Sequence, residues 1–471
     1  MSRRLARGAV SAFVIAVLAA VVSSPAGAQQ DTLAQEVDSL ARRLSALELQ
    51  LAEQQVLMQQ ALEDRLRAEE RAAVAGRDPA RIDVPDQRQR MVSGIYGRPF
   101  VWRGGGAAVG GYVDIELEAE LDDEGELGFD QHRLIPFVFA EITDRIHFGT
   151  EIELEHGVSG NAGNVKVEFA ALDVAFADAL AVRGGIVLSP LGKFNLIHDS
   201  PVNDFTQRPL VNGQIIPTTL SEAGLGLFGT FYPSELSVLT YEAYVVNGFH
   251  DGLAESTGEL RRSPRIRSGR GNLGGDNNRA KSLVARLGYS PFLGLELGVS
   301  GHTGVYSNEG EPLFYTDDAG VPGSVRFDGD ERLTIGALDG IFTRGPFEVL
   351  GEAAYAMVDM PEPEVAAPPT FDVPEQVDQL GYYVQSNYHF GHGWVGLFDR
   401  SVFTASVRWG AIDFDTDVDG DDATRLSFGL NWRPVEETVF KLSYDIDSET
   451  PRLGEESEDE KRIWFSLASY F

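Results

Sequence analysis

The chain closes with the stretch KRIWFSLASYF, residues 461–471, which alternates as a β-strand does. Every second residue, from Ile463 through Leu467 to Phe471, would share one mostly apolar face. No segment after the first 30 residues has 18 consecutive apolar residues, so the sequence predicts no membrane-spanning helix there. In lipid every backbone N–H and C=O must be bonded internally, which leaves a closed barrel as the other spanning structure. The stretch therefore predicts the terminal strand of a membrane β-barrel.

The amino-terminal residues and the composition point to an exported, acidic protein. Three arginines precede an apolar run over 12–22, and Ala26-Gly27-Ala28 fits a cleavage site. We therefore expect a signal peptide at 1–28 and a mature chain that begins at Gln29. The 471 residues carry a formal net charge of -33, which argues against a nucleic-acid partner. The absence of Cys excludes disulfides and thiolate metal sites.

Residues 29–75 have a helical period that the rest of the chain lacks. Apolar side chains recur in steps of four and three at the a and d positions of a heptad: Leu33, Val37, Leu40, Leu44, Leu47, Leu51 and Met58. This pattern predicts a short periplasmic coiled coil. The alternative is a single amphipathic helix packed on its own domain. Residues 76–106 contain several prolines and end in three glycines, which indicates a linker.

From residue 107 onward the period changes to two, as in strands. The sequence predicts an all-β domain of sixteen antiparallel strands over 107–471, at 107–121, 132–142, 145–156, 165–176, 180–189, 223–232, 236–248, 280–290, 293–307, 331–343, 346–358, 379–391, 401–413, 424–434, 437–447 and 462–471. Connections between them alternate between short and long, as periplasmic turns and outer loops do in a bacterial outer-membrane barrel. A soluble all-β fold is the alternative, but it gives no reason for that alternation.

Charged residues at one parity of these strands are candidates for the lumen wall. Acidic candidates lie on the first and third predicted strands: Asp114, Glu116, Glu118, Glu120, Glu151, Glu153 and Glu155. Basic candidates lie on other strands: Arg183, Arg286 and Arg408. Because like charges on one wall repel each other, the pattern implies a wet interior or basic partners across the bore. One interpretation is a solute-selecting field across the lumen, and the other is structural ion pairs that stiffen it.

The third long connection, 190–222, is unusually apolar for an exposed loop. We expect it to fold inward and narrow a pore, although a loop at a subunit contact would look similar. Its titratable groups are the candidate constriction residues: Lys193, His198, Asp199, Asp204, Arg208 and Glu222. Two of these groups are basic and three are acidic, apart from His198. This balance suggests a weak selectivity for cations.

Two further outer connections carry charge clusters, and no catalytic motif stands out. Residues 260–275 hold five arginines and no acid, a pattern that suits phosphate groups of solutes or of lipopolysaccharide. Asp415, Asp417 and Asp419 match the start of an EF-hand loop, so a weak Ca²⁺ or Mg²⁺ site is one interpretation and a solvated acidic turn is the other. We expect no other cofactor and no enzyme activity.

With these features placed, the chain resembles the phosphate-selective porin O and P family. The resemblance in sequence is best from Arg183 to Phe194 and from Ser221 to Gly226. It implies a homotrimeric diffusion channel in the outer membrane, inserted by the barrel assembly machinery that reads a terminal aromatic residue such as Phe471. It also implies selectivity for phosphate or other anions, whereas the acidic strands point away from that selectivity.

The sequence thus leaves two functions open. The first is a passive porin for small hydrophilic or charged solutes, surrounded by outer-membrane lipid and lipopolysaccharide. The second is an envelope tether whose coiled coil links the outer membrane to the cell wall. An outer-membrane lipid hydrolase would need a Ser–His pair that no spacing here supports.

Overall fold

The computed structural model describes residues 102–104, 107–120, 127–159, 163–276, 278–363, 372–452 and 458–471. The predicted signal peptide and coiled coil, residues 1–75, lie outside the described residues, as does most of the predicted linker. Within the range predicted as linker, residues Trp102–Gly104 form a short strand, β1, which pairs with the start of β2. Among the described residues, no helix is long and apolar enough to cross a membrane.

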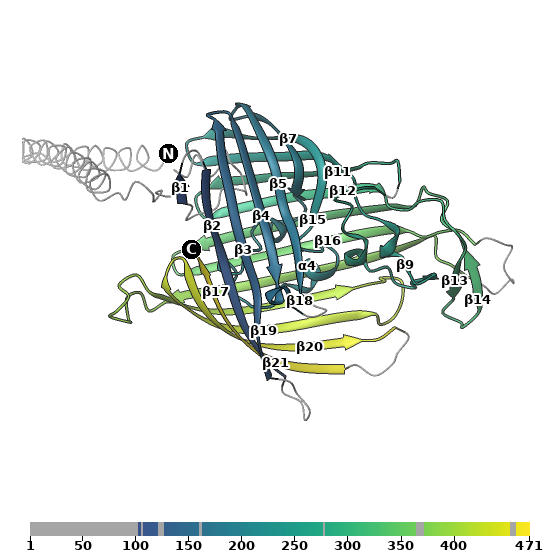
Figure 1. Ribbon diagram of the computed structural model, residues 1–471. Coiled ribbons are helices and arrows are strands. Elements are labelled where there is room, and N and C mark those ends of the chain that lie inside the picture. The colour runs from purple at the N-terminus through teal and green to yellow at the C-terminus, as the bar shows by residue number, and fades with distance from the viewer. Residues whose placement is uncertain are drawn as a thin grey trace, which may run out of the picture. The chain divides into compact units, whose positions relative to one another are not determined.

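The described residues form a closed antiparallel barrel of sixteen strands, as the sequence predicts (Figure 1). In chain order these are β2 (Ala107–Glu120), β3 (Leu127–Thr143), β4 (Ile146–Glu155), β5 (Asn164–Ala177), β6 (Leu180–Leu188), β7 (Ser221–Ser234), β8 (Ser237–Val246), β11 (Ser282–Phe292), β12 (Leu295–Val305), β15 (Arg332–Arg344), β16 (Phe347–Asp359), β17 (Gln376–Phe390), β18 (Val402–Asp413), β19 (Asp422–Val435), β20 (Thr438–Thr450) and β21 (Glu458–Tyr470). Each pairs with the next, and β21 pairs with β2 from Tyr112↔Tyr470 to Glu120↔Arg462. That last ladder closes the ring and leaves no free edge.

The two ends of the barrel differ in their connections. Thr143 and Ile146 are separated by two residues, and β5–β6, β7–β8, β11–β12, β15–β16 and β19–β20 are joined by equally short turns. The exception is the connection from β17 to β18, residues 391–401. We call this the short-turn end, and the opposite end, where the other connections lie, the long-loop end. The start of β2 and Phe471 meet at the short-turn end, where the backbone N–H of Phe471 donates to Gly111.

The start of β3 is the strand boundary that the sequence predicts least accurately. β3 begins at Leu127 rather than at 132, because a bulge opposite β2 interrupts its period. Asp114 pairs with Arg133 and Glu116 with Asp130, so two residues of β3 face one residue of β2. Such an extra residue bends a strand and redirects its side chains.

Several smaller elements lie in the long connections. The one from β6 to β7 holds the 3₁₀-helix η3 (Phe194–Leu196) and the helix α4 (Leu210–Gln214). A four-stranded sheet joins two further loops through β9 (Glu255–Ser256), β10 (Glu259–Leu260), β13 (Leu313–Thr316) and β14 (Pro322–Val325). The other 3₁₀-helices among the described residues are η2 (His156–Val158), η4 (Asp251–Leu253) and η5 (Ile266–Gly269). The sequence did not predict the small sheet, since its strands have only two to four residues.

Candidate functional site: the interior of the barrel

Side chains of the wall alternate between an apolar outer face and a polar inner face. In β11, Leu283 is 57% exposed and Val284 is 1% exposed, and in β20 Leu442 is 49% exposed while Ser443 is 2% exposed. Exposed aliphatic and aromatic residues recur in this way around the ring, as in Leu338, Val384, Trp409 and Phe428. An apolar band of this kind matches hydrocarbon outside and water or packed side chains inside.

The predicted acidic wall residues divide into two groups. Asp114, Glu116, Glu151 and Glu153 are buried and face the interior. Glu118 and Glu120 instead line a cavity of about 200 Å³ at the long-loop end, together with Glu116, Gly128, Phe129, Asp130 and Trp464. Glu155 is half-buried. The acids therefore extend from the interior to the rim.

Buried carboxylates of this wall have cationic or hydroxyl partners that the sequence did not identify. The guanidinium Nε of Arg133 lies 2.8 Å from Glu153, which also pairs with Lys166. Ser466 donates to Asp114 at 2.7 Å. Arg133 and Lys166 lie on the strands that flank Glu153, and their side chains face the same side of the sheet as the acid with which they pair. Ion pairs between adjacent strands thus account for part of the acidic wall.

The predicted basic wall residues Arg183 and Arg286 form local ion pairs. Arg183 is fully buried, and its Nε and Nη2 donate to both oxygens of Asp173 at 2.6 and 2.7 Å. Arg286 donates in the same forked way to Asp339. Two parallel charge-assisted bonds are a strong and directional pairing. These two arginines therefore stiffen the wall.

Arg408, the third basic wall residue, contacts the inserted connection between β6 and β7. Its Nη2 donates to the carbonyl of Gln207 at 2.7 Å, and its guanidinium lies 4.5 Å from the ring centroid of Phe205. Cationic groups over aromatic faces are attracted by the ring quadrupole. Arg408 thus links β18 to the segment that the sequence expects to fold inward.

That segment, residues 189–220, contacts inward-facing side chains from several parts of the ring. Near its start, the backbone N–H groups of Lys193 and Phe194 donate to Glu352 of β16. The Lys193 ammonium pairs with Glu296 of β12 at 2.5 Å. His198 lies 3.0 Å from Glu168 of β5. The first third of the segment therefore touches strands on different sides of the bore.

The middle of the segment follows the polar inner face of β17–β21. Asp199 accepts a hydrogen bond from the hydroxyl of Tyr470 at 2.7 Å. Asp204 accepts hydrogen bonds from Asn387 at 2.7 Å and from Gln385. Asn431 donates to the backbone carbonyl of Asp204 at 2.8 Å. These contacts place Asp199 and Asp204 against the inner face of β17, β19 and β21.

The last part of the segment is held by a group of arginines. The Arg208 guanidinium donates to the carbonyl of Thr218, and Arg267 of η5 donates to the same carbonyl at 3.0 Å. Arg270 donates to the carbonyl of Thr219 at 3.1 Å. Burial, aided by the charge of Arg133, lowers the pKa of Arg208 to about 10. Arg262 likewise donates to the carbonyl of Thr316 at 2.9 Å, so three of the five arginines of residues 260–275 bind protein carbonyls.

Glu222, the last predicted constriction residue, lies at the start of β7 and is buried. Its Oε1 lies 3.0 Å from His302 Nε2 on β12. The six predicted constriction residues thus contact different partners around the lumen and do not form one ring of charge. The alternation of residues along the strands could not predict the partners of these six residues. Side chains that meet inside the barrel come from parts of the chain that are remote in sequence.

The acidic outer turn has a cationic partner within the protein. Arg452 donates to Asp415 at 2.7 Å and makes a forked contact with Asp318. Asp417 donates its backbone N–H to Asp415 at 3.2 Å. The Ca²⁺ or Mg²⁺ site at Asp415, Asp417 and Asp419 remains a prediction, and in this structure Arg452 supplies the positive charge at Asp415.

A row of inward-facing residues, which the sequence reasoning missed in part, crosses four adjacent strands. Register pairs Arg408 of β18 with Ser427, Ser427 with Asp445 of β20, and Asp445 with Arg462 of β21. Asp445 is 1% exposed, and neither of its carboxylate oxygens has a hydrogen-bond donor among the described residues. The hydroxyl of Ser427 is likewise buried without a protein partner there. The alternation of polar and apolar residues in β20 would have predicted that Asp445 and the buried Lys441 face the interior.

No protein-family model matches the chain. A protein of Aquifex aeolicus (strain VF5), described as "Uncharacterized protein", is 32% identical over 212 residues, which are 44% of this chain and 47% of that protein. The match thus spans about half the length of that relative.

Solved structures with a similar arrangement include proteins described as a porin, an outer membrane channel and an outer membrane protein. The "Anion-selective porin from Comamonas acidovorans" has a TM-score of 0.49 and 10% identity, covering 78% of this chain and 99% of that one. The "outer membrane channel DcaP of Acinetobacter baumannii" has a TM-score of 0.49 and 13% identity, with the same coverage. The trimer form of OmpT of Vibrio cholerae has a TM-score of 0.47 and 12% identity, again over 78% and 99%. Similarities at 10–13% identity concern the fold and say nothing of solute or selectivity.

Proposed function

We propose that the chain is an outer-membrane porin, a passive diffusion channel for small hydrophilic or charged solutes. The observation that carries this proposal is the row from Arg408 to Arg462. At its centre the Ser427 hydroxyl and the Asp445 carboxylate have no hydrogen-bond partner within the described part of the chain. A buried carboxylate without a hydrogen bond is costly, so such groups are met by water or ions. A wet interior inside an apolar outer band is what a channel requires.

The inserted segment 190–222 forms the constriction in this proposal. Its support is the set of contacts that reach β5, β12, β16, β17 and β21, since a segment touching all of these crosses the bore. The α4 contacts with β16, β17, β18 and β19 add to this. In this proposal solutes pass through the part of the bore that the segment does not fill.

A weak preference for cations is the selectivity that the charges favour. Among the described strand residues, ten buried side chains are acidic: Asp114, Glu116, Glu151, Glu153, Glu168, Glu222, Asp339, Glu352, Asp445 and Asp447. Five are basic: Arg133, Arg183, Arg286, Arg408 and Lys441. Because charges act over about 8 Å at physiological salt, this excess counts where the bore is narrow. The positive charges of Arg208, Arg267 and Arg270 oppose this preference for cations. The phosphate or anion selectivity implied by the family resemblance would depend on them.

The proposed setting is the outer membrane of a Gram-negative-type bacterium, with residues 29–75 in the periplasm and lipopolysaccharide around the outer rim. Apolar heptad positions over 33–62 support association of chains, and the family resemblance favours a homotrimer. Charged substitutions at Leu40, Leu44 and Leu47 should then weaken association in detergent, measured as native mass. A fully trimeric triple variant would remove the coiled coil from assembly.

A tether with a plugged barrel is the second candidate function. The observation that favours it is the same inserted segment, which is bonded to so many strands that it could close the bore. In that case the coiled coil would link the outer membrane to the cell wall, and the barrel would anchor it in the membrane.

Thiol accessibility separates the two functions, because the chain has no Cys of its own. Ser427 and Phe428 are neighbours on β19, the first 0% exposed and inward-facing, the second 45% exposed and outward-facing. Silver ions, which are small and bind thiols, should reduce the current through Ser427→Cys in a planar bilayer and leave Phe428→Cys unchanged. No current in either variant would favour the tether. A steady current that silver leaves unchanged in Ser427→Cys would instead show that solutes do not pass this row.

A further inference from the structure

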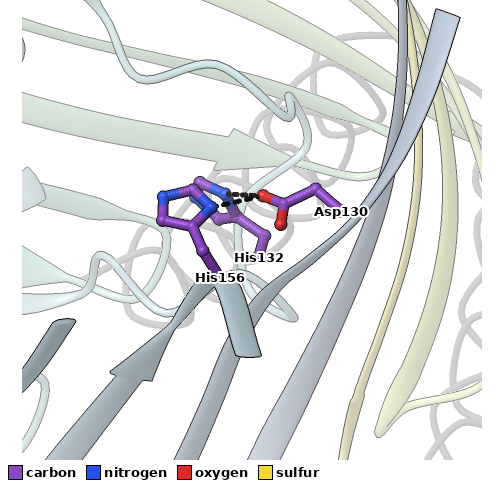
Figure 2. A group of neighbouring side chains, drawn as sticks. All are labelled: Asp130, His132 and His156. Atoms are coloured by element: carbon purple, nitrogen blue, oxygen red, sulfur yellow. Dashed lines mark hydrogen bonds and ion pairs between the residues drawn. The ribbon is translucent and has the colours of Figure 1, made fainter. Parts of the chain in front are cut away.

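Two histidines and an aspartate meet at the long-loop end of the barrel (Figure 2). Asp130 and His132 belong to β3, and His156 opens η2 after β4. One oxygen of Asp130, Oδ2, lies 2.7 Å from His156 Nδ1 and 3.2 Å from His132 Nδ1. Within the described part of the chain, they are the one group of three His, Asp or Glu residues whose candidate ligand atoms all lie within 4.8 Å of each other.

The bulge in β3 brings Asp130 and His132 to the inner side. Further along β3, Arg133, Ile135 and Phe137 are buried while Leu134 is 36% exposed. Strict alternation would therefore leave the residues at 130 and 132 on the outer face with Leu134. The extra residue opposite β2 breaks that alternation, so that His132 Nδ1 lies 3.6 Å from Glu116, a buried inner residue. Bulges often redirect a side chain in this way beside a functional site.

A tight turn brings His156 to the same place. His156, Gly157 and Val158 have φ values of +52°, +62° and +53°. A β-branched residue rarely adopts this left-handed conformation. The turn sets the His156 ring edge-on to the His132 ring, with centroids 5.4 Å apart and planes at 85°. Both Nδ1 atoms consequently point at the carboxylate of Asp130, as Figure 2 shows.

Two imidazoles and a carboxylate form a ligand set for a borderline transition metal. Zinc binds His nitrogen and carboxylate oxygen at about 2.0–2.2 Å, which puts tetrahedral ligand atoms roughly 3.3 Å apart. The observed separations of 2.7 and 3.2 Å are close to that value, so small side-chain rotations suffice. Imidazole ligands favour Zn²⁺, Ni²⁺ and Cu²⁺ over Ca²⁺ or Mg²⁺.

The surroundings favour loading with a cation from solvent. The side chains of His132, His156 and Asp130 are 23%, 33% and 37% exposed. Asp130 also lines the acidic rim cavity of about 200 Å³ with Glu118 and Glu120. Carboxylates on one wall of a recess raise the local concentration of cations. Glu116 is near enough to supply a fourth ligand.

We propose that Asp130, His132 and His156, with Glu116 as a fourth candidate ligand, bind one divalent transition-metal ion of the zinc class. The ion replaces the two Nδ1···Oδ2 hydrogen bonds, and each imidazole keeps its remaining proton on Nε2. Because its ligands come from β2, β3 and η2, the bound ion also fastens η2 to these two strands.

The test uses the full chain, folded in detergent and stripped with EDTA. Zn²⁺ titrated against a chromophoric chelator should give one equivalent bound. His132→Ala and His156→Ala should each weaken binding by at least about 100-fold, since even outer-shell changes cost 10–100-fold. The control is His147→Ala, whose exposed ring lies at the other end of β4, and it should bind as wild type does.

Pulsed electron paramagnetic resonance of the wild-type chain with Cu²⁺ gives a second readout, which does not depend on whether a variant folds. Two coordinated imidazoles are expected in its modulation spectrum. Absence of stoichiometric binding, fewer than two imidazoles, or equal loss of binding in His147→Ala would overturn the proposal. Retention of wild-type affinity in the two site variants would do the same.

Discussion

Glu352 of β16 accepts a hydrogen bond from the backbone N–H of Lys193 at 2.6 Å, which fixes the start of the inserted segment to the wall. The same carboxylate accepts the N–H of Phe194 at 3.1 Å and the side-chain amide of Asn212 near its other end. Gly192 is required beside it, since an added Cβ would lie 2.5 Å from a Glu352 oxygen, and its φ is +69°. One side chain thus holds two distant parts of the segment.

Glu352→Ala should loosen the inserted segment without unfolding the barrel. Each buried N–H left without an acceptor costs about 1–3 kcal/mol, which the closed ladder of sixteen strands can tolerate. We expect noisier single-channel current and faster proteolysis within 195–215. Glu348→Ala is the matched control, since Glu348 lies on the same strand and accepts from Asn387. Equal effects of the two substitutions would mean that Glu352 does not hold the segment.

Arg286 and Asp339 should be coupled in stability. Removing one member of a buried ion pair costs about 3–5 kcal/mol, because the other is left charged and unpaired. Arg286→Met should therefore lower the urea midpoint of unfolding in detergent more than the double variant with Asp339→Leu does. Additive losses in the two single variants would show that the pair is not coupled.

Arg452 should hold three outer loops together. It contacts Asp318, Asp415 and Ser263. Arg452→Ala should increase hydrogen exchange in residues 309–330, whereas Lys281→Ala, which removes an ion pair with Asp276, should not. Unchanged exchange in the Arg452 variant would assign the ordering of these loops to the small sheet alone.

The same contact has a pH dependence. Hydrogen bonds from Arg452 lower the pKa of Asp318 below its ordinary value of 3.8. A carboxylate with a lowered pKa stabilises the fold above its ordinary value and loses that effect as the pH falls through the lowered one. Protection of 309–330 should therefore persist at pH 5 and decline below pH 4 in the wild type only.

Charge selectivity should lean weakly to cations. The reversal potential across a tenfold KCl gradient should indicate this lean, and Asp445→Asn should reduce it, because that residue lies in the interior row without a hydrogen-bond donor in the described chain. Ser443→Ala, two residues away, is the neutral control. A strong anion preference that Arg208→Ala abolishes would instead support the phosphate-type selectivity of the family that the sequence resembles.

The sequence predicts the wall better than the interior. Alternation between apolar and polar residues depends on local chemistry, so all sixteen strands could be placed, with the boundary of β3 shifted by its bulge. The partners of Asp204 and Glu222 lie on strands that are remote in sequence, and no local pattern predicts which strands these are. His132 and His156 were missed for the same reason, since a bulge and a left-handed turn bring them together.

The inserted segment is also where the central claim is tested most directly. Single-channel conductance of the purified trimer or monomer in planar bilayers should show a steady open channel. Deleting 195–215, with the flanking strands kept and folding checked by circular dichroism, should raise that conductance severalfold. A wild-type barrel that is folded yet passes no steady current, and opens only after the deletion, would contradict a porin and establish a plugged anchor.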